Sequence, residues 1–292
     1  MLIGIFSAFG ASLSWTYACS IWRTQTIRYK PVDVNFLKNI LAFIVFSPTI
    51  IFLNYTTEYR YLFLLIISGI IGIGLGDTFY LKSLKLIGTR KTLSIEALSP
   101  LIAAFTGELF MNEDLSIKSW LGILIVSGSL ITIIGKKNLL LDKDSKLVVR
   151  NISLVQLIYP LLSVFCAVIA ASLSRVVLLE SNLLPIQTTE VRILGAILFL
   201  LFISKLKINF FINTLARKEK IRFIISVLLG TNIGILFQQV VFQTLPLGIG
   251  WTLLSTSPIM SLFFSKKEEG VLTKEIIFFT ILLFIGLCLI IL

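Results

Sequence analysis

The sequence predicts an all-α integral membrane protein with ten transmembrane helices, arranged as two inverted repeats of five helices. Hydrophobic residues make up 57% of the 292 positions and charged residues only 14%, and the mean hydropathy is +0.98. A soluble domain carries about 25% charged residues. A membrane-spanning helix needs about 20 apolar residues, so ten such segments use most of the chain. The third observation is that landmarks of the first half recur in the second half.

Ten apolar segments can be placed in order along the chain. The first five lie at residues 2–22, 34–53, 61–82, 89–111 and 117–135, and the second five at 152–178, 186–204, 221–243, 248–265 and 273–292. A polar linker separates them, so we divide the chain into a first repeat (1–136), a linker (137–151) and a second repeat (152–292). The first segment has neither a basic region before it nor a small-residue cleavage site, which favours a span over a removable signal peptide.

Two landmarks occur in both halves: a proline seven residues before a basic residue, and a Ser-Pro pair within the fourth span. They are Pro31 and Lys38 with Pro185 and Arg192, and Ser99-Pro100 with Ser257-Pro258. The offsets between the copies are 154 and 158 residues. A repeat with an odd number of spans enters the membrane from opposite sides in its two copies. Five plus five therefore predicts an inverted repeat, an architecture that supports alternating access.

Charge and composition predict the orientation and exclude several classes of protein. The loops after the odd-numbered spans hold 21 of the 26 Lys and Arg residues, and the opposite side holds three. The positive-inside rule then places both termini outside the cytoplasm. These bases lie in short loops, so we expect membrane lipids and not nucleic acid as their partners. The chain has no histidine, and its three cysteines lack paired spacing, so we expect no metal site, disulfide framework or other cofactor.

Four motifs in the first half resemble the EamA repeat of the drug/metabolite transporter superfamily. They are G-D-x-x-Y-x-x-S-L-x-x-x-G at 76–88, L-S-P-L-x-A-A at 98–104, G-E-L at 107–109 and W-L-G-I-L-I-V-S-G at 120–128. The likeness is strongest over 68–135 and recurs weakly over 221–292. It implies a solute carrier, often an exporter of amino acids or other small metabolites. It also implies cytoplasmic termini, against the loop charges, so both orientations stay open.

The candidate site is predicted from acidic residues inside apolar spans. A charged side chain there costs at least ~2.5 kcal/mol on insertion scales, and it marks a functional site by default. Asp77 and Glu96 are such residues, and Pro100 lacks the N–H that would bond the Glu96 carbonyl. Lys38 lies near the start of the second span, on the same side of the membrane as the short turn that joins the spans carrying Asp77 and Glu96. We expect Asp77 or Glu96 to bind a substrate amine or a proton and Lys38 to hold a carboxylate. The alternative is a structural ion pair in which Lys38 or Lys82 neutralises an acid.

Further candidates flank these three residues. Small and polar residues at Thr92, Glu96, Ser99, Ala103 and Gly107 share one helix face, which either lines a cavity or packs closely on a neighbouring helix. The other candidate site residues are aromatic rings for stacking, a polar cluster from the opposite side and two helix breaks. The aromatic rings are Trp15 and Tyr80, and the helix breaks are at Pro100 and Pro258. The polar cluster comprises Arg192, Gln238 and Gln239, with Arg175 and Glu190.

The sequence thus predicts a secondary-active transporter of a small organic solute, not an enzyme. No Gly-x4-Gly-Lys-Ser/Thr motif is present, which excludes the common ATP-binding loop. We expect an exporter or exchanger in a bacterial inner membrane, with proton coupling through Glu96; a homodimer is left open. One alternative is a flippase for a lipid-linked substrate on the same fold. Another is an intramembrane aspartyl protease, because Gly74-Leu75-Gly76-Asp77 matches G-x-G-D, although the other aspartates fall in loops or at span ends.

Overall fold

The described part of the chain consists of helices joined by short connections, with no strand among these residues. The computed structural model describes residues 1–49, 58–135, 154–204, 215–257, 260 and 274–291. Consecutive elements join into ten helical rods, and each predicted span overlaps one of them. In order, the elements are α1 (Leu2–Arg28), α2 (Pro31–Phe46), α4 (Tyr59–Ser68), η1 (Gly69–Gly76), α5 (Asp77–Ile87), α6 (Thr89–Glu96), α7 (Ser99–Met111), α8 (Ile117–Gly135), α9 (Leu154–Glu180), α10 (Pro185–Ile203), α12 (Arg217–Ser226), η3 (Val227–Ile233), α13 (Gly234–Thr244), α14 (Leu247–Leu254) and α16 (Lys274–Ile291).

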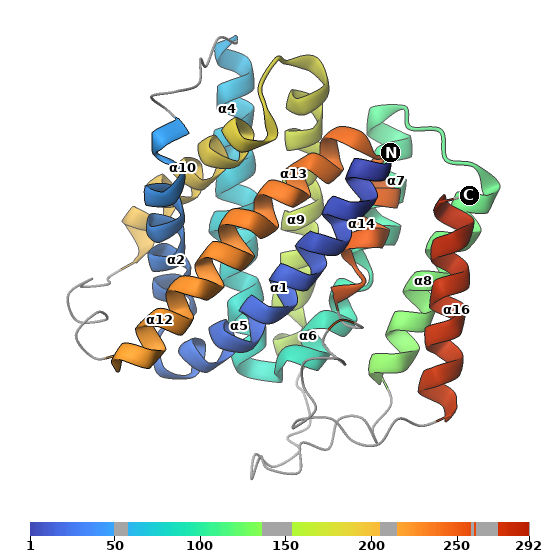
Figure 1. Ribbon diagram of the computed structural model, residues 1–292, viewed down its shortest axis with the longest axis horizontal. Helices are drawn as coiled ribbons and strands as arrows, with labels where there is room; N and C mark the ends of the chain where they lie inside the picture. Colours follow the sequence, from blue (N-terminus) through green and yellow to red (C-terminus); the bar gives the residue numbers. More distant parts are fainter. Residues whose placement is uncertain (50–57, 136–153, 205–214, 258–259, 261–273, 292) are drawn as a thin grey trace.

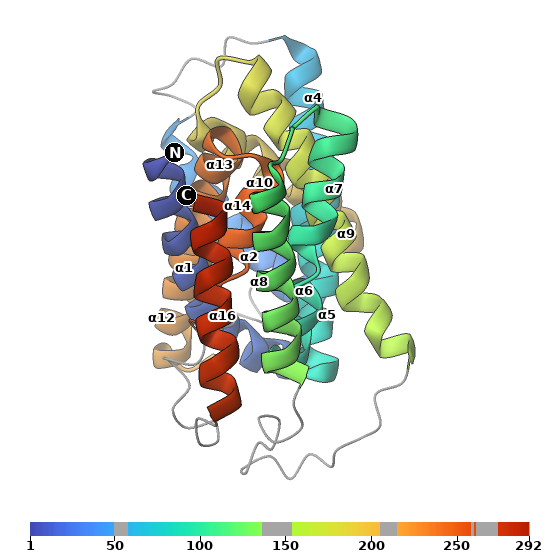
Figure 2. The same cartoon turned by 90° about the vertical axis from the view of Figure 1, so that its right-hand side faces the viewer.

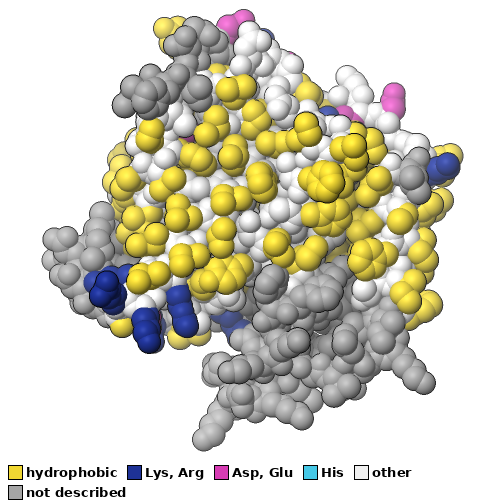
Figure 3. Space-filling view, in the orientation of Figure 1, with side chains coloured by type: hydrophobic (Ala, Val, Ile, Leu, Met, Phe, Trp, Pro, Cys, Tyr) yellow, Lys and Arg dark blue, Asp and Glu magenta, His cyan; other side chains and the backbone are white. Residues whose placement is uncertain are grey.

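Helix length and composition make this a multi-pass integral membrane protein. Within the described residues, five helices are long and apolar enough to cross a bilayer: Leu2–Arg28, Tyr59–Ile87, Val155–Glu180, Pro185–Ile203 and Arg217–Thr244. Three shorter apolar helices accompany them, at Ser99–Met111, Ile117–Thr132 and Phe278–Ile291. Hydrophobic side chains cover the middle of the face seen in Figure 3, with most of its Lys and Arg at the lower left and Asp and Glu towards the upper edge.

The two halves of the chain interlock. The first helix of each half packs against the third rod of the other half: α1 lies against η3 and α13, and α9 lies against η1 and α5 (Figure 1). The last helices, α8 and α16, form a pair at the edge of the bundle (Figure 2). Their backbones approach closely because Gly122 and Gly286 face each other. A Cβ on Gly122 would lie 2.7 Å from the Gly286 carbonyl oxygen.

Two irregularities occur at matching places in the halves. The π-helical segments η1 and η3 begin 158 residues apart, and a glycine lies at the junction of each with the next α-helix: Gly76 ends η1 and Gly234 begins α13. Long π-helical segments are rare, so the coincidence is informative. The helical breaks after Glu96 and Leu254 are also 158 residues apart. Residues 97–98 and 255–256 are turns, so each fourth rod is interrupted instead of running as one helix.

Pro100 explains the first break. It lies in the first turn of α7, where a backbone N–H has no partner within the helix, and the turn at 97–98 precedes it. The sequence-based expectation of a freed acceptor at the Glu96 carbonyl is consistent with this ending of α6 at Glu96. Pro258, the corresponding proline of the second half, lies outside the described residues.

Both chain ends lie at one end of the bundle (Figure 1). A Cβ on Gly4 would be 2.8 Å from Leu245 Cγ, which places the N-terminus beside the turn between α13 and α14. The opposite end, where α1 finishes and α12 begins, carries exposed Arg28, Arg217 and Lys218. The described structure therefore keeps the charge asymmetry that the sequence predicts, with the termini on the side poor in basic residues.

The close packing of η1 against α10 leads to a first testable prediction. A Cβ on Gly69 would overlap the carbonyl oxygen of Arg192 and lie 2.7 Å from its carbonyl carbon. Backbone atoms cannot swing aside, so we expect Gly69→Ala to destabilise the protein by about 3 kcal/mol, the upper end of typical overpacking. Gly128 is the matched control, because a Cβ there meets nothing within 4 Å. Thermal unfolding in detergent micelles measures both variants, and equal stability of the two would contradict this packing.

Candidate functional site

A cavity of about 110 Å³ lies between the two halves of the chain. Three charged residues line it: Asp77 at the start of α5, Glu96 at the end of α6 and Arg192 on α10. Two indole rings, those of Trp15 and Trp251, complete a wall that is partly apolar. The chamber therefore combines both signs of charge with flat apolar surfaces inside the bundle.

Most of the site residues predicted from the sequence meet at this cavity. Seven line it: Trp15, Asp77, Tyr80, Glu96, Ser99, Arg192 and Gln238. Lys38 and Gln239 do not. Pro100 is buried directly after Ser99. On the shared face of the fourth rod, Glu96 and Ser99 line the cavity, whereas Gly107 packs against other residues. One part of that face therefore lines a cavity and another part serves close packing.

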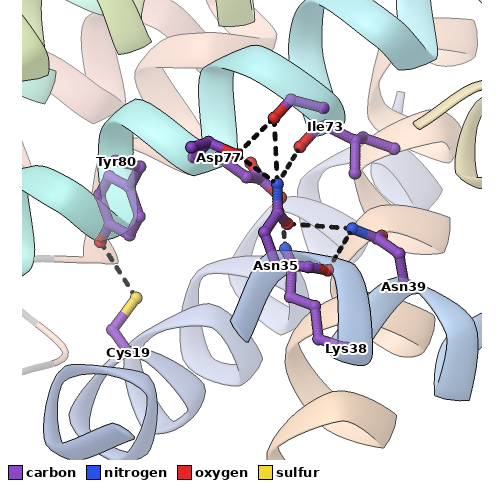
Figure 4. Close-up of polar contacts among 9 residues, drawn as sticks. Cys19, Asn35, Lys38, Asn39, Ile73, Asp77 and Tyr80 are labelled. Carbon is purple, nitrogen blue, oxygen red and sulfur yellow. Dashed lines mark hydrogen bonds and ion pairs between the residues drawn. The ribbon is translucent and has the colours of Figure 1, made fainter. Parts of the chain in front are cut away.

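Lys38 neutralises Asp77 from behind the cavity wall (Figure 4). Its Nζ forms an ion pair with Asp77 Oδ2, and the side chain is 1% exposed. The ammonium also lies 4.8 Å from the centre of the Trp22 ring and 5.8 Å from that of Trp15, within range of cation–π attraction. In this conformation Lys38 is thus paired with Asp77. The Asp77 side chain is 16% exposed and also lines the cavity.

Asn35 is a structural residue that the sequence analysis missed. Its Nδ2 donates to the carbonyl oxygens of Ile73 and Gly74, at 2.8 and 3.1 Å, and to Thr78 Oγ1 (Figure 4). The π-helical backbone of η1 is held in this way just before Asp77. Asn39 in turn donates to the carbonyl and side-chain oxygens of Asn35. The available signal was the run of polar residues Asn35, Lys38 and Asn39 on one face of an apolar span.

Tyr80 carries the aromatic side of the cavity. Its ring centre is 5.6 Å from that of Trp15, and its hydroxyl is 3.0 Å from Cys19 Sγ (Figure 4). Cys19 and Tyr80 are both fully buried. The Trp15 ring also meets Trp22 edge-on, at 5.2 Å. The predicted stacking residues therefore form one rigid aromatic wall next to the Lys38–Asp77 pair.

Glu96 stands apart from this network. Among the described residues, no hydrogen bond or ion pair involves its carboxyl group, which lies at the cavity where α6 ends. At the second break, by contrast, side-chain hydroxyls of α1 donate hydrogen bonds to the backbone carbonyls. Ser12 Oγ donates to the Leu254 carbonyl at 2.8 Å, and Thr16 Oγ1 to the Ser257 carbonyl at 2.9 Å. The two breaks are thus matched in position and different in chemistry.

Arg192 is the least satisfied charged group of the site. It is 3% exposed, and its Nε and Nη1 atoms have no hydrogen-bond partner in the described part of the chain. Gly72 makes room for it, since a Cβ there would lie 3.2 Å from Arg192 Nη2. The sequence assigned Arg192 to a separate polar cluster, and the fold brings it to the cavity that Asp77 and Glu96 also line.

The other members of the predicted second cluster form separate contacts. Arg175 pairs with Glu113 and donates to the Phe242 carbonyl, and Leu247 N–H donates to Glu113 Oε2 at 2.7 Å. Gln239 Oε1 accepts hydrogen bonds from Ser174 and Thr188. Glu190 accepts one from Thr49. Only Arg192 and Gln238 of this cluster reach the cavity.

Glu113 is a further structural residue that the sequence analysis did not single out. Asn112 ends α7 in the left-handed conformation, with φ of 51°, and this turns the chain back so that Glu113 N–H donates to the Gly107 carbonyl. Gly107 leaves room for the acid, because a Cβ there would lie 2.5 Å from Glu113 Oε2. The G-E-L motif thus supports an ion pair that joins the halves near the termini.

The first half of the chain is similar to a known family. Residues 2–135 match the EamA-like transporter family. The EamA match begins with α1 and ends with α8, so it covers the five rods of the first half. It confirms the resemblance carried by the motifs at 76–88 and 98–104. Proteins of the EamA family are membrane transporters of the drug/metabolite superfamily and not enzymes.

Structural comparison extends the likeness beyond the EamA-matched half. One crystal structure, described only as that of a protein, superposes with a TM-score of 0.70 at 14% sequence identity. The superposition covers 98% of this chain and 95% of that one. At this level of identity, the likeness shows a shared fold. No curated protein matches the sequence.

Proposed function

We propose that this EamA-like protein is a secondary-active carrier of a small organic solute, which binds in the central cavity between two inverted five-helix repeats. The repeat rests on the paired landmarks: the π-helical segments and the helix breaks both recur after 158 residues. The family match over residues 2–135 supports a first repeat of 1–136, and the paired landmarks support a second repeat of 152–292.

The observation that carries the proposal is the content of the cavity. Glu96 and Arg192 lie in its wall without partners among the described residues, and each comes from a different half. Charged groups inside a membrane bundle are costly and mark substrate or ion pathways. The breaks in the two interrupted rods also lie at this cavity, where Ala97 and Ser255 line it, as is common at transporter sites. A solute held between the halves is released to either side as the halves rock about it.

The direction and coupling of transport extend the same proposal. The solute leaves the cell or is exchanged, in a bacterial inner membrane, and the end rich in Arg and Lys faces the cytoplasm. Glu96 takes up and releases a coupling proton, because a carboxyl group without a basic partner can exist as the neutral acid in a poorly solvated interior. The protease alternative has no support in the described structure, where Asp77 is paired with Lys38 and Asp33 accepts a hydrogen bond from Ser204.

Glu96→Gln tests the carrier and its coupling together. Metabolites inside and outside cells are compared for the wild type and the variant at equal membrane levels. We expect the wild type to displace one class of solute. In proteoliposomes we expect Glu96→Gln to retain solute exchange and lose its dependence on pH, since glutamine cannot carry the proton.

Glu108→Gln is the matched control, because Glu108 is an exposed acid on the same rod. It should behave as the wild type. Unchanged pH dependence in Glu96→Gln would remove Glu96 from the coupling step. Cells in which the wild type displaces no solute over a broad panel would contradict the carrier itself.

A further inference from the structure

Arg192 and the residues around it indicate what the solute carries. Building on the carrier function proposed above, we propose that the cavity binds a small organic carboxylate whose anionic group is held by the Arg192 guanidinium. The inference rests on three independent features of the described structure: the unsatisfied donors at the cavity wall, the asymmetry between the two halves and the geometry of the guanidinium itself.

Two side chains that line the cavity carry hydrogen-bond donors without an acceptor in the described part of the chain. Arg192 Nε and Nη1 are buried and unpartnered, and so is Nε1 of Trp251, which lines the same cavity. Arginine and tryptophan side chains donate only. Buried polar groups are nearly always hydrogen-bonded in folded proteins, so each exception calls for an explanation. A negatively charged ligand that accepts hydrogen bonds would supply the Arg192 guanidinium with both an acceptor and a counter-charge.

The asymmetry between the halves explains why Arg192 lacks a partner. Lys38 and Arg192 occupy equivalent positions, 154 residues apart, each seven residues after the proline that opens its helix. Lys38 pairs with Asp77. At the 158-residue offset that relates the third rods, Asp77 is replaced by Ile235, which lines the cavity without a charge. The second half therefore has the cation and not its anion, and the solute supplies the missing group.

The guanidinium selects the chemistry of the ligand. Its planar fork matches the two oxygens of a carboxylate, and it remains charged when buried. The cavity lies inside the bundle, between helices of both halves, so we expect a small acid as the bound molecule. Glu96 lies at the same cavity and can accept a hydrogen bond from an amine on that acid. Amino acids and simple carboxylic acids are both within this class.

Binding is tested on the purified full-length protein in detergent micelles. The probes are L-alanine, L-leucine, propionate and succinate, each compared with its own amide. Thermal unfolding followed by tryptophan fluorescence measures affinity. We expect at least one acid to raise the unfolding temperature and its amide to have no effect. Arg192→Gln should weaken that binding roughly 10- to 100-fold, the value of a charge-assisted hydrogen bond, and Arg192→Lys should weaken it less.

A second variant keeps the test decisive if Arg192→Gln does not fold. Ile235→Asp supplies the carboxylate that the second half lacks, and it should weaken binding of the acid at least tenfold more than Ile235→Asn, which has the same shape without the charge. Equal binding by the two Ile235 variants, equal binding of acids and amides, or no stabilisation by any of the four acids would overturn the proposal.

Exchange in proteoliposomes separates this inference from the carrier function. A carboxylate that binds through Arg192 but is never exchanged would leave the anion site standing and refute the carrier. A neutral or purely cationic solute that is exchanged equally by the wild type and Arg192→Gln would leave the carrier standing and overturn the anion site.

Discussion

Replacing Asp77 with asparagine is expected to lower the free energy of unfolding by about 3–5 kcal/mol, the usual cost of removing one partner from a buried ion pair. The variant keeps the shape of the side chain but leaves the Lys38 ammonium, 1% exposed, without its counter-charge. The neighbouring Trp15 and Trp22 rings offset only a small part of this cost, since a cation–π contact contributes about 0.5–2 kcal/mol. Chemical unfolding in mixed micelles, followed by tryptophan fluorescence, measures the loss.

The two members of this pair should not be equivalent. Asp77 is 16% exposed and faces the cavity, so Lys38→Met leaves a carboxylate that water can still reach and should cost less than Asp77→Asn. The double variant removes both charges and should recover much of the stability. Asp114→Asn is the control, because Asp114 is exposed in a loop. An Asp77→Asn protein as stable as this control would show that Lys38 and Asp77 are not paired in the membrane protein.

The second large effect is expected for Glu113→Gln, which breaks the ion pair joining the halves near the termini. Both side chains of the Glu113–Arg175 pair are 9% exposed, and Glu113 also accepts the Leu247 N–H. We expect a loss of about 3 kcal/mol, because Arg175 would remain buried without a carboxylate. The same unfolding measurement applies, with Arg175→Gln and the double variant completing a thermodynamic cycle.

The pair between Arg28 and Glu219 provides the comparison for that cycle. It has the same chemistry, at 2.7 Å, but lies at the opposite end of the bundle with side chains 58% and 32% exposed. Water and salt screen an exposed pair, so Glu219→Gln should have a far smaller effect. Similar losses for Glu113→Gln and Glu219→Gln, or strict additivity of the Glu113 and Arg175 substitutions, would contradict a buried link between the halves.

The sequence was sufficient to locate the rods and seven of the residues that line the cavity. Apolar length and loop charge depend on residues that are close in the chain, so the ten predicted segments each overlap a helical rod. The cost of a charge in an apolar span is likewise a property of the residue and its immediate neighbours. That is why Asp77, Glu96 and Arg192 could be named as candidates before the fold was known.

Only the tertiary structure shows which of the charged side chains pair with each other. Lys38, Asp77, Glu96 and Arg192 all lie in apolar spans, and nothing in their spacing states that Lys38 binds Asp77 while Arg192 stays unsatisfied. The role of Asn35, which holds carbonyls nearly 40 residues away, was equally hidden. Hydropathy adds up along the chain, whereas an ion pair depends on distances of a few ångströms across helices, and those distances arise when the two halves interlock.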